Sequence, residues 1–155
     1  MMRTVYRIAI LLMVAALASG QSSPPVGGEI SGMYSFVHEG EFVQLEANGD
    51  KVDGVVSRFK SDDPEKAEAQ FVDQSFESGK LQGSELSFRT RPLDGVWFEF
   101  TGKVERGEGK SPSDESYWII RGKLTETRKA ADGKTTTKTH ELTMKSFPLD
   151  ASPSR

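Results

Sequence analysis

Between residues 30 and 147, apolar and polar side chains alternate with a period of two along most of the chain. Within residues 41–47, for example, Val43, Leu45 and Ala47 share one side. Successive side chains of a β-strand point to opposite faces, so this alternation predicts strands that bury one face. Eight segments follow the pattern: residues 30–37, 41–47, 51–59, 70–82, 85–90, 96–105, 117–128 and 135–147.

Short connections separate these segments, and no stretch shows the period of a long amphipathic helix. Asn48 and Gly49 supply a tight turn, and a change of apolar phase predicts a bulge near Ser78 and Gly79. The pattern predicts an all-β domain over residues 30–147, an antiparallel up-and-down meander. A closed eight-stranded barrel is favoured, because closure removes the two open edges of a flat meander. A two-sheet β-sandwich is the alternative.

Two similar segments, WFEFTGK and YWIIRGK, place their tryptophans in different phases. Trp97 lies five residues before Gly102, whereas Trp118 lies four residues before Gly122. We therefore predict that Trp118 faces the interior and that Trp97 faces outward. A glycine inside a strand marks a bend or leaves room for a ligand, and both interpretations of Gly102 and Gly122 stay open.

The first twenty residues have the order of a secretory signal peptide: a short basic region, an apolar run and small residues. Cleavage is expected near Ala18 or Gly20, which makes the protein secreted or periplasmic. The apolar run is short for a membrane span, and no later segment is apolar enough to be one. Residues 21–29 are predicted to be a flexible linker, and residues 148–155 a disordered tail.

Composition narrows the class of protein further. The chain has no cysteine, so the exported domain relies on its hydrophobic core and not on disulfides, which fits a bacterial protein. The formal net charge is −3, and loss of Arg3 and Arg7 with the signal peptide makes it −5. An acidic chain without a basic run is a poor candidate for binding nucleic acid.

No sequence motif for catalysis is present. The chain lacks a Gly-x-Ser-x-Gly elbow and a cysteine nucleophile. His38 and His140 are its only histidines, and a catalytic zinc site usually needs three protein ligands. We expect no metal, no cofactor and no enzymatic activity, although a pair of inward carboxylates on different strands is left open.

One part of the sequence resembles a known class of barrel. Residues 30–36, ISGMYSF, resemble the Gly-x-Trp opening of lipocalin and avidin barrels, with Tyr34 in place of the tryptophan. Residues 40–56, GEFVQLEANGDKVDGVV, are similar in rhythm to the second and third strands of avidin-type barrels. The resemblance implies a calycin-type barrel that binds a small hydrophobic molecule at its open end.

Two sets of residues are candidates for a functional site. Inward residues would contact a small hydrophobic or amphipathic ligand: Tyr34, Phe36, Phe100, Trp118 and His140. Outward apolar residues would form a surface for a protein partner: Phe42, Trp97 and Ile119. The first hypothesis is a ligand-binding barrel; the alternative is a filled-core structural or partner-binding module of the bacterial envelope. The volume inside the barrel separates them.

Overall fold

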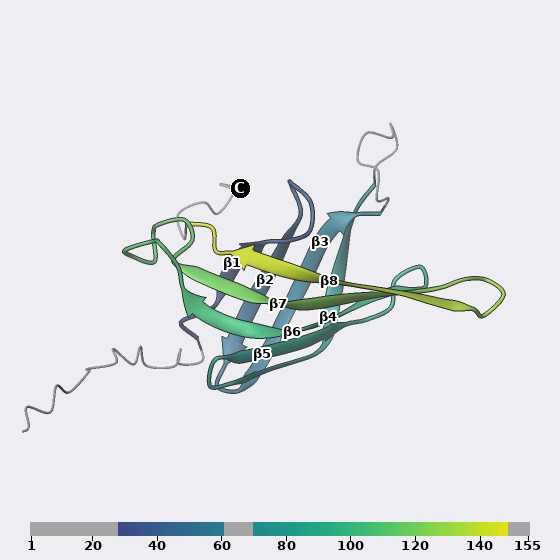
Figure 1. Cartoon of the computed structure of the whole chain (residues 1–155), viewed down its shortest axis with the longest axis horizontal. Coiled ribbons are helices and arrows are strands. Elements are labelled where there is room, and N and C mark those ends of the chain that lie inside the picture. The colour runs from purple at the N-terminus through teal and green to yellow at the C-terminus, as the bar shows by residue number, and fades with distance from the viewer. Residues whose placement is uncertain (1–27, 61–69, 149–155) are drawn as a thin grey trace, which may run out of the picture.

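The computed structural model describes residues 28–60 and 70–148. These residues form eight strands, and no helix is present among them (Figure 1). The strands are β1 (Gly32–Ser35), β2 (Phe42–Asn48), β3 (Lys51–Phe59), β4 (Phe71–Gln82), β5 (Glu85–Thr90), β6 (Val96–Arg106), β7 (Trp118–Lys129) and β8 (Thr135–Lys145). They agree closely with the eight segments predicted from the alternation of apolar residues.

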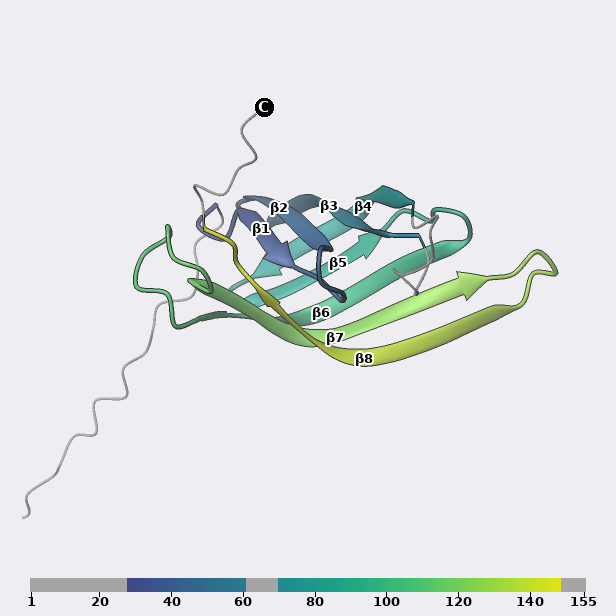
Figure 2. The same ribbon diagram turned by 90° about the horizontal axis from the view of Figure 1, so that it is seen from above.

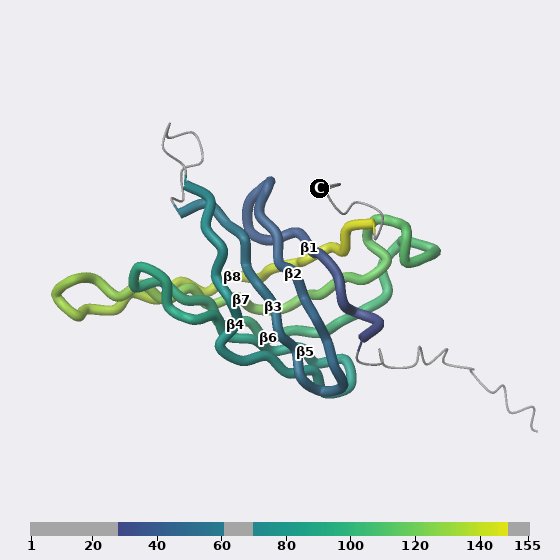
Figure 3. Tube along the Cα trace, turned by 180° about the vertical axis from the view of Figure 1, so that it is seen from behind, coloured from purple at the N-terminus to yellow at the C-terminus, as the bar shows by residue number. Residues whose placement is uncertain are grey.

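All eight strands belong to one sheet, in which each strand pairs antiparallel with the next along the chain. The up-and-down meander is therefore confirmed, and the strands do not divide into the two sheets of a sandwich. The sheet curls strongly, so that β2 and β3 run steeply across β6, β7 and β8 (Figures 1 and 3). The core lies between these two parts of the curled sheet.

The curled sheet closes at one end only. Tyr34 of β1 bridges to Ser146, just beyond β8, and the backbone N–H of Phe147 donates to the carbonyl of Met33 at 2.8 Å. The N–H of Lys145 donates to the Ser35 hydroxyl at 3.0 Å. The β7–β8 hairpin extends well away from this contact (Figure 2). The fold is barrel-like, with most of the outer edge of β8 free among the described strands.

The predicted bulge is present in β4. The register with β5 shifts between Phe76 and Ser78, so that Glu77 and Ser78 are both exposed. Beyond the shift, Gly79 faces inward against β3, where an added Cβ would lie 2.1 Å from the carbonyl oxygen of Val52. A bulge that inserts one residue restores the inward phase of the strand beyond it.

The inward residues of the strands form one continuous hydrophobic core. Its fully buried members with the largest side chains include Tyr34, Phe100, Ile30, Leu45, Leu86, Ile120, Leu124 and Met144. Trp118 is buried, whereas Trp97 is half-buried and faces outward beside exposed Glu99. The prediction of opposite faces for the two tryptophans is confirmed.

Gly102 and Gly122 are directly paired across β6 and β7. A Cβ added to Gly102 would lie 2.4 Å from the Arg121 carbonyl oxygen and 2.6 Å from Cζ of Phe100. A Cβ added to Gly122 would lie 2.4 Å from Cα of Gly102. The two glycines thus allow close backbone approach, and the ring of Phe100 fills the space over Gly102.

The predicted signal peptide (1–20), most of the linker and the tail beyond Pro148 lie outside the described residues. Gly28 and Glu29, at the end of the predicted linker, belong to a turn at the closed end of the barrel. Within residues 28–60 and 70–148, no helix is long and apolar enough to cross a membrane.

Candidate functional site

The middle of the barrel is filled by aromatic rings. Phe76 stacks on Phe88 with ring centroids 4.4 Å apart, and Phe88 stacks on Phe100 at 5.3 Å. Phe36 meets Phe98 edge to face at 5.5 Å. Such pairs add stabilisation beyond the area that they bury. Phe36 and Phe100, predicted as ligand contacts, therefore face inward, and each packs against another phenylalanine of the core.

Tyr34 and Trp118 lie together at the closed end of the barrel. The Tyr34 hydroxyl donates to the carbonyl of Ile30 at 2.6 Å, and burial raises the pKa of this hydroxyl well above its usual range. Nε1 of Trp118 donates to the carbonyl of Glu29 at 2.9 Å. A pocket that both residues line holds about 20 Å³, the space of a single water molecule.

His140 was expected inside the barrel, and the structure corrects this. It pairs with buried Leu124 and shares the inward phase of Leu142 and Met144, but it is exposed. The reason is that β8 is the outermost described strand of the sheet at this position, whereas Leu124 beside it lies on β7, between β6 and β8. His38 is also exposed, and no group of three or more metal-ligating side chains occurs among the described residues.

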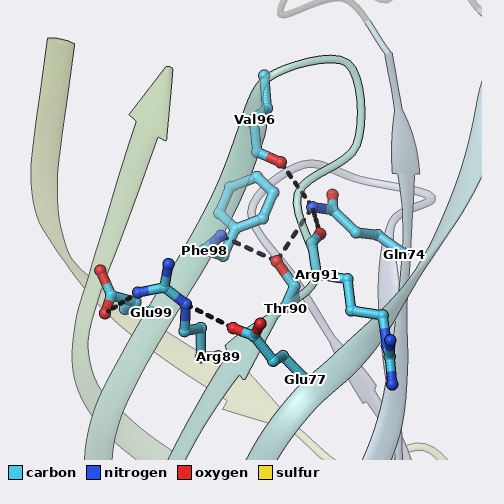
Figure 4. Close-up of polar contacts among 8 residues, drawn as sticks. All are labelled: Gln74, Glu77, Arg89, Thr90, Arg91, Val96, Phe98 and Glu99. Atoms are coloured by element: carbon cyan, nitrogen blue, oxygen red, sulfur yellow. Dashed lines mark hydrogen bonds and ion pairs between the residues drawn. The ribbon is translucent and has the colours of Figure 1, made fainter. Parts of the chain in front are cut away.

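A buried polar network, which the sequence analysis missed, lies near the β5–β6 turn (Figure 4). Gln74 is 2% exposed, and its Oε1 accepts a hydrogen bond from Nε of buried Arg58 at 3.1 Å. Nε2 of Gln74 donates to the Thr90 hydroxyl at 3.0 Å and to the carbonyls of Arg91 and Val96 at 2.6 and 2.8 Å. The signal was present in the sequence, since Gln74 shares the phase of Phe76.

A buried carboxylate, Glu41, lines one small pocket together with Arg58 of this network, at the open end of the barrel. Glu41 accepts the backbone N–H groups of His38 and Phe59, both at 3.0 Å. The pocket that Glu41 lines with Arg58 and Glu126 holds about 20 Å³, and Glu126 pairs with Arg128. These polar groups are engaged with one another and with the backbone, which suits a structural role.

Phe42 lies on the outer face of the sheet, as predicted, and borders a groove. The groove has a volume of about 570 Å³, and its apolar lining includes Met33, Phe42, Phe147 and Pro148. Phe42 also contacts Phe71, whose ring centroid lies 6.0 Å away and which is 46% exposed. An apolar outer surface therefore runs from the groove onto β4.

Trp97 lies on a different part of the outer face, on β6. The Arg89 guanidinium sits 5.4 Å from its ring and forms ion pairs with Glu77 and Glu99 at 2.8 and 2.9 Å (Figure 4). Trp97 Nε1 has no hydrogen-bond partner among the described residues. A second groove, of about 630 Å³, lies beside this cluster and is lined by Arg89, Glu99, the core residues Phe88 and Phe100, and mostly polar and charged residues of the neighbouring strands.

Ile119 was expected to complete an exposed patch with Phe42 and Trp97, and this expectation is wrong. Ile119 points outward from β7 but is buried, because the segment between β6 and β7 folds over it. A Cβ added to Gly107 in that segment would lie 2.8 Å from Cγ1 of Ile119. Phe42 and Trp97 themselves lie on β2 and β6, with three strands between them in the sheet.

Comparison with protein-family models, curated proteins and solved structures found no match. The class of protein is therefore assigned from the fold alone. It is an all-β, barrel-like antiparallel meander of eight strands.

Proposed function

We propose that this protein is a non-enzymatic, filled-core β-barrel module that acts by binding a protein partner at the groove beside Phe42. One contrast carries the proposal. The pockets that border Tyr34, Phe36 and Trp118 hold about 20 Å³ each, whereas the groove beside Phe42 holds about 570 Å³. The groove of about 630 Å³ beside Arg89 reaches Phe100, but its lining is mostly charged and polar, which suits an apolar ligand less well. Ligand pockets in proteins usually measure about 300–1,000 Å³, so the interior spaces fall short and the groove beside Phe42 does not.

The lining of the groove supports a protein partner. Met33, Phe42 and Phe147 offer apolar contact, while Gln44 and Glu46 on the same face offer polar contacts at its rim. An apolar centre within a polar rim is typical of protein interfaces. We infer a partner that inserts an apolar side chain between β2 and the segment that follows β8.

The test is photo-crosslinking at position 42 in cells that export the protein. A benzophenone derivative of phenylalanine at position 42 is expected to yield one discrete adduct with another protein, because it points into the groove. The same residue at position 123, on the outer face of β7 and outside both grooves, is the control and is expected to yield none. No adduct at position 42, or the same adducts at both positions, would contradict the proposal.

Export is a separate part of the proposal. Protein recovered from the native host is expected to begin at Ser19 or Gln21, because the small residues before these positions fit signal peptidase cleavage. Mass spectrometry of the intact protein measures this directly. Recovery of chains that still begin at Met1 from the membrane fraction would overturn the assignment.

A further inference from the structure

The outer edge of β8 has backbone groups that no described residue pairs with. At its end, the N–H groups of Lys145 and Phe147 point toward β1, whereas the N–H of Ser146 donates to Trp118 on the β7 side. Backbone groups alternate in direction along a strand, and β8 pairs with β7 without a register shift. The odd-numbered residues between 135 and 143 therefore present both N–H and C=O away from β7. No described strand pairs with them (Figure 2).

This part of β8 has few of the usual protections of an edge strand. Natural edges carry proline, bulges, short strands or charged side chains, which prevent pairing with another chain, and of these residues 135–143 have only the charged side chains of Lys138 and Glu141. Residues 135–143 contain no proline, and five of the nine are threonine, a residue that favours extended structure. Residues 135–141 are exposed. Their partners on β7 are paired with β6 on the other side as far as Arg128, so β8 is here the outermost described strand of the sheet.

We propose that the free edge of β8 pairs antiparallel with the same edge of a second copy of this chain, about a two-fold axis at Thr139. The axis places Thr139 opposite its own copy, Thr137 opposite Glu141, and Thr135 opposite Thr143. All of these residues present their N–H and C=O groups to the shared edge. The eight-stranded sheets of the two copies are then joined through β8 into one continuous sheet.

The charge pattern of β8 favours this register. A two-fold axis at Lys138 or at Glu141 would set two like charges directly opposite each other, which destabilises a sheet. An axis at His140 leaves the first two residues of the edge without partners. The axis at Thr139 uses the whole edge from 135 to 143 and sets Lys138 opposite His140 on the inner face.

The outer face of the joined sheet is a row of threonines. The hydroxyls of Thr125 and Thr139 already lie 3.0 Å apart within one copy. Pairing of Thr139 with its own copy extends this row to four threonines across two chains, and cross-strand threonine pairs are favourable. This second-copy contact is separate from the groove beside Phe42, so either proposal can fail without the other.

A single introduced cysteine tests the register, because the chain contains none of its own. Opposed residues in a hydrogen-bonded antiparallel pair have Cα atoms about 5.5 Å apart, within the range that a disulfide spans. Mild oxidation of Thr139→Cys is therefore expected to give a covalent dimer. Thr137→Cys is the matched control, since its two copies would lie about 13 Å apart along the strands. Equal cross-linking of both variants, or of neither, would overturn the register.

Removal of one edge-facing N–H tests the pairing itself. Thr139→Pro deletes an N–H that points away from β7, and an edge strand tolerates proline at such a position. The wild-type protein is expected to sediment with twice the mass of the chain, and Thr139→Pro with the mass of one chain. Thr139→Val keeps the N–H and should remain dimeric, and thermal unfolding checks that all three fold. A wild-type protein that sediments as a monomer would overturn the proposal. This holds also if the free edge of β8 in that monomer binds an unrelated peptide.

Discussion

Phe100→Ala is expected to lower the free energy of unfolding by about 3–5 kcal/mol, the usual range for truncation of a buried phenylalanine. Phe100 is 1% exposed, and its ring stacks on Phe88 and covers Gly102. Neither glycine of the Gly102–Gly122 pair has a side chain that can move into the space. The cavity left by the substitution therefore stays open, which places the expected loss in the upper part of the range. Urea denaturation of the purified protein measures it.

Phe71→Ala is the matched control for this prediction. Phe71 is a phenylalanine of the same sheet, but it points outward and is 46% exposed. Its truncation removes little buried surface, so the loss is expected to stay near or below about 1 kcal/mol. Equal losses for Phe71→Ala and Phe100→Ala would refute the assignment of the inner and outer faces.

Gln74→Leu is expected to destabilise the protein by roughly 3 kcal/mol, because buried groups that lose a hydrogen-bond partner keep the cost of their desolvation. The substitution removes the acceptor of Arg58 Nε and the donor to the Arg91 carbonyl, while the Val96 carbonyl keeps the Leu93 N–H. Leucine is more apolar than glutamine, so the transfer of the side chain into the interior favours the variant and does not explain the loss. Thermal and urea denaturation both report it.

An exposed glutamine provides the comparison. Gln44 faces outward on β2 and is exposed, so Gln44→Leu is expected to change the stability by no more than about 0.5 kcal/mol. If Gln74→Leu is as stable as Gln44→Leu, the polar network does not hold the open end of the barrel together.

The strands and their order could be predicted from the sequence because period-two alternation is a local signal. It placed Trp97 and Trp118 on opposite faces and located the bulge after Phe76. Where one face of a strand lies over the core, apolar residues recur at every second position, so the sequence shows which face is buried.

The errors arise where burial depends on what lies beside or over a strand. His140 has the inward phase, yet it is exposed because β8 is the outermost described strand of the sheet at this position. Ile119 has the outward phase, yet residues of the β6–β7 connection cover it. The phase of a residue shows which face of the sheet its side chain lies on. It does not show which strands lie beside or opposite that residue, or whether a loop covers it.

The polar network was missed for a related reason. Arg58 and Gln74 occupy inward phases, but in an amphipathic pattern they look like interruptions at a strand end. Only the paired positions of β3, β4 and β5 show that they meet and satisfy one another.

The central claim is that the barrel is filled and that the outer face is its working surface. The most direct test is the emission of Trp118 in the Trp97→Phe variant, which retains it as the only tryptophan, during titration with oleate. Trp118 is 9% exposed and packs within the core at the closed end, so a ligand that filled the barrel as far as this end would change its surroundings. The account predicts that the emission stays unchanged throughout the titration, whereas a saturable change would show that the barrel admits a ligand and would contradict it.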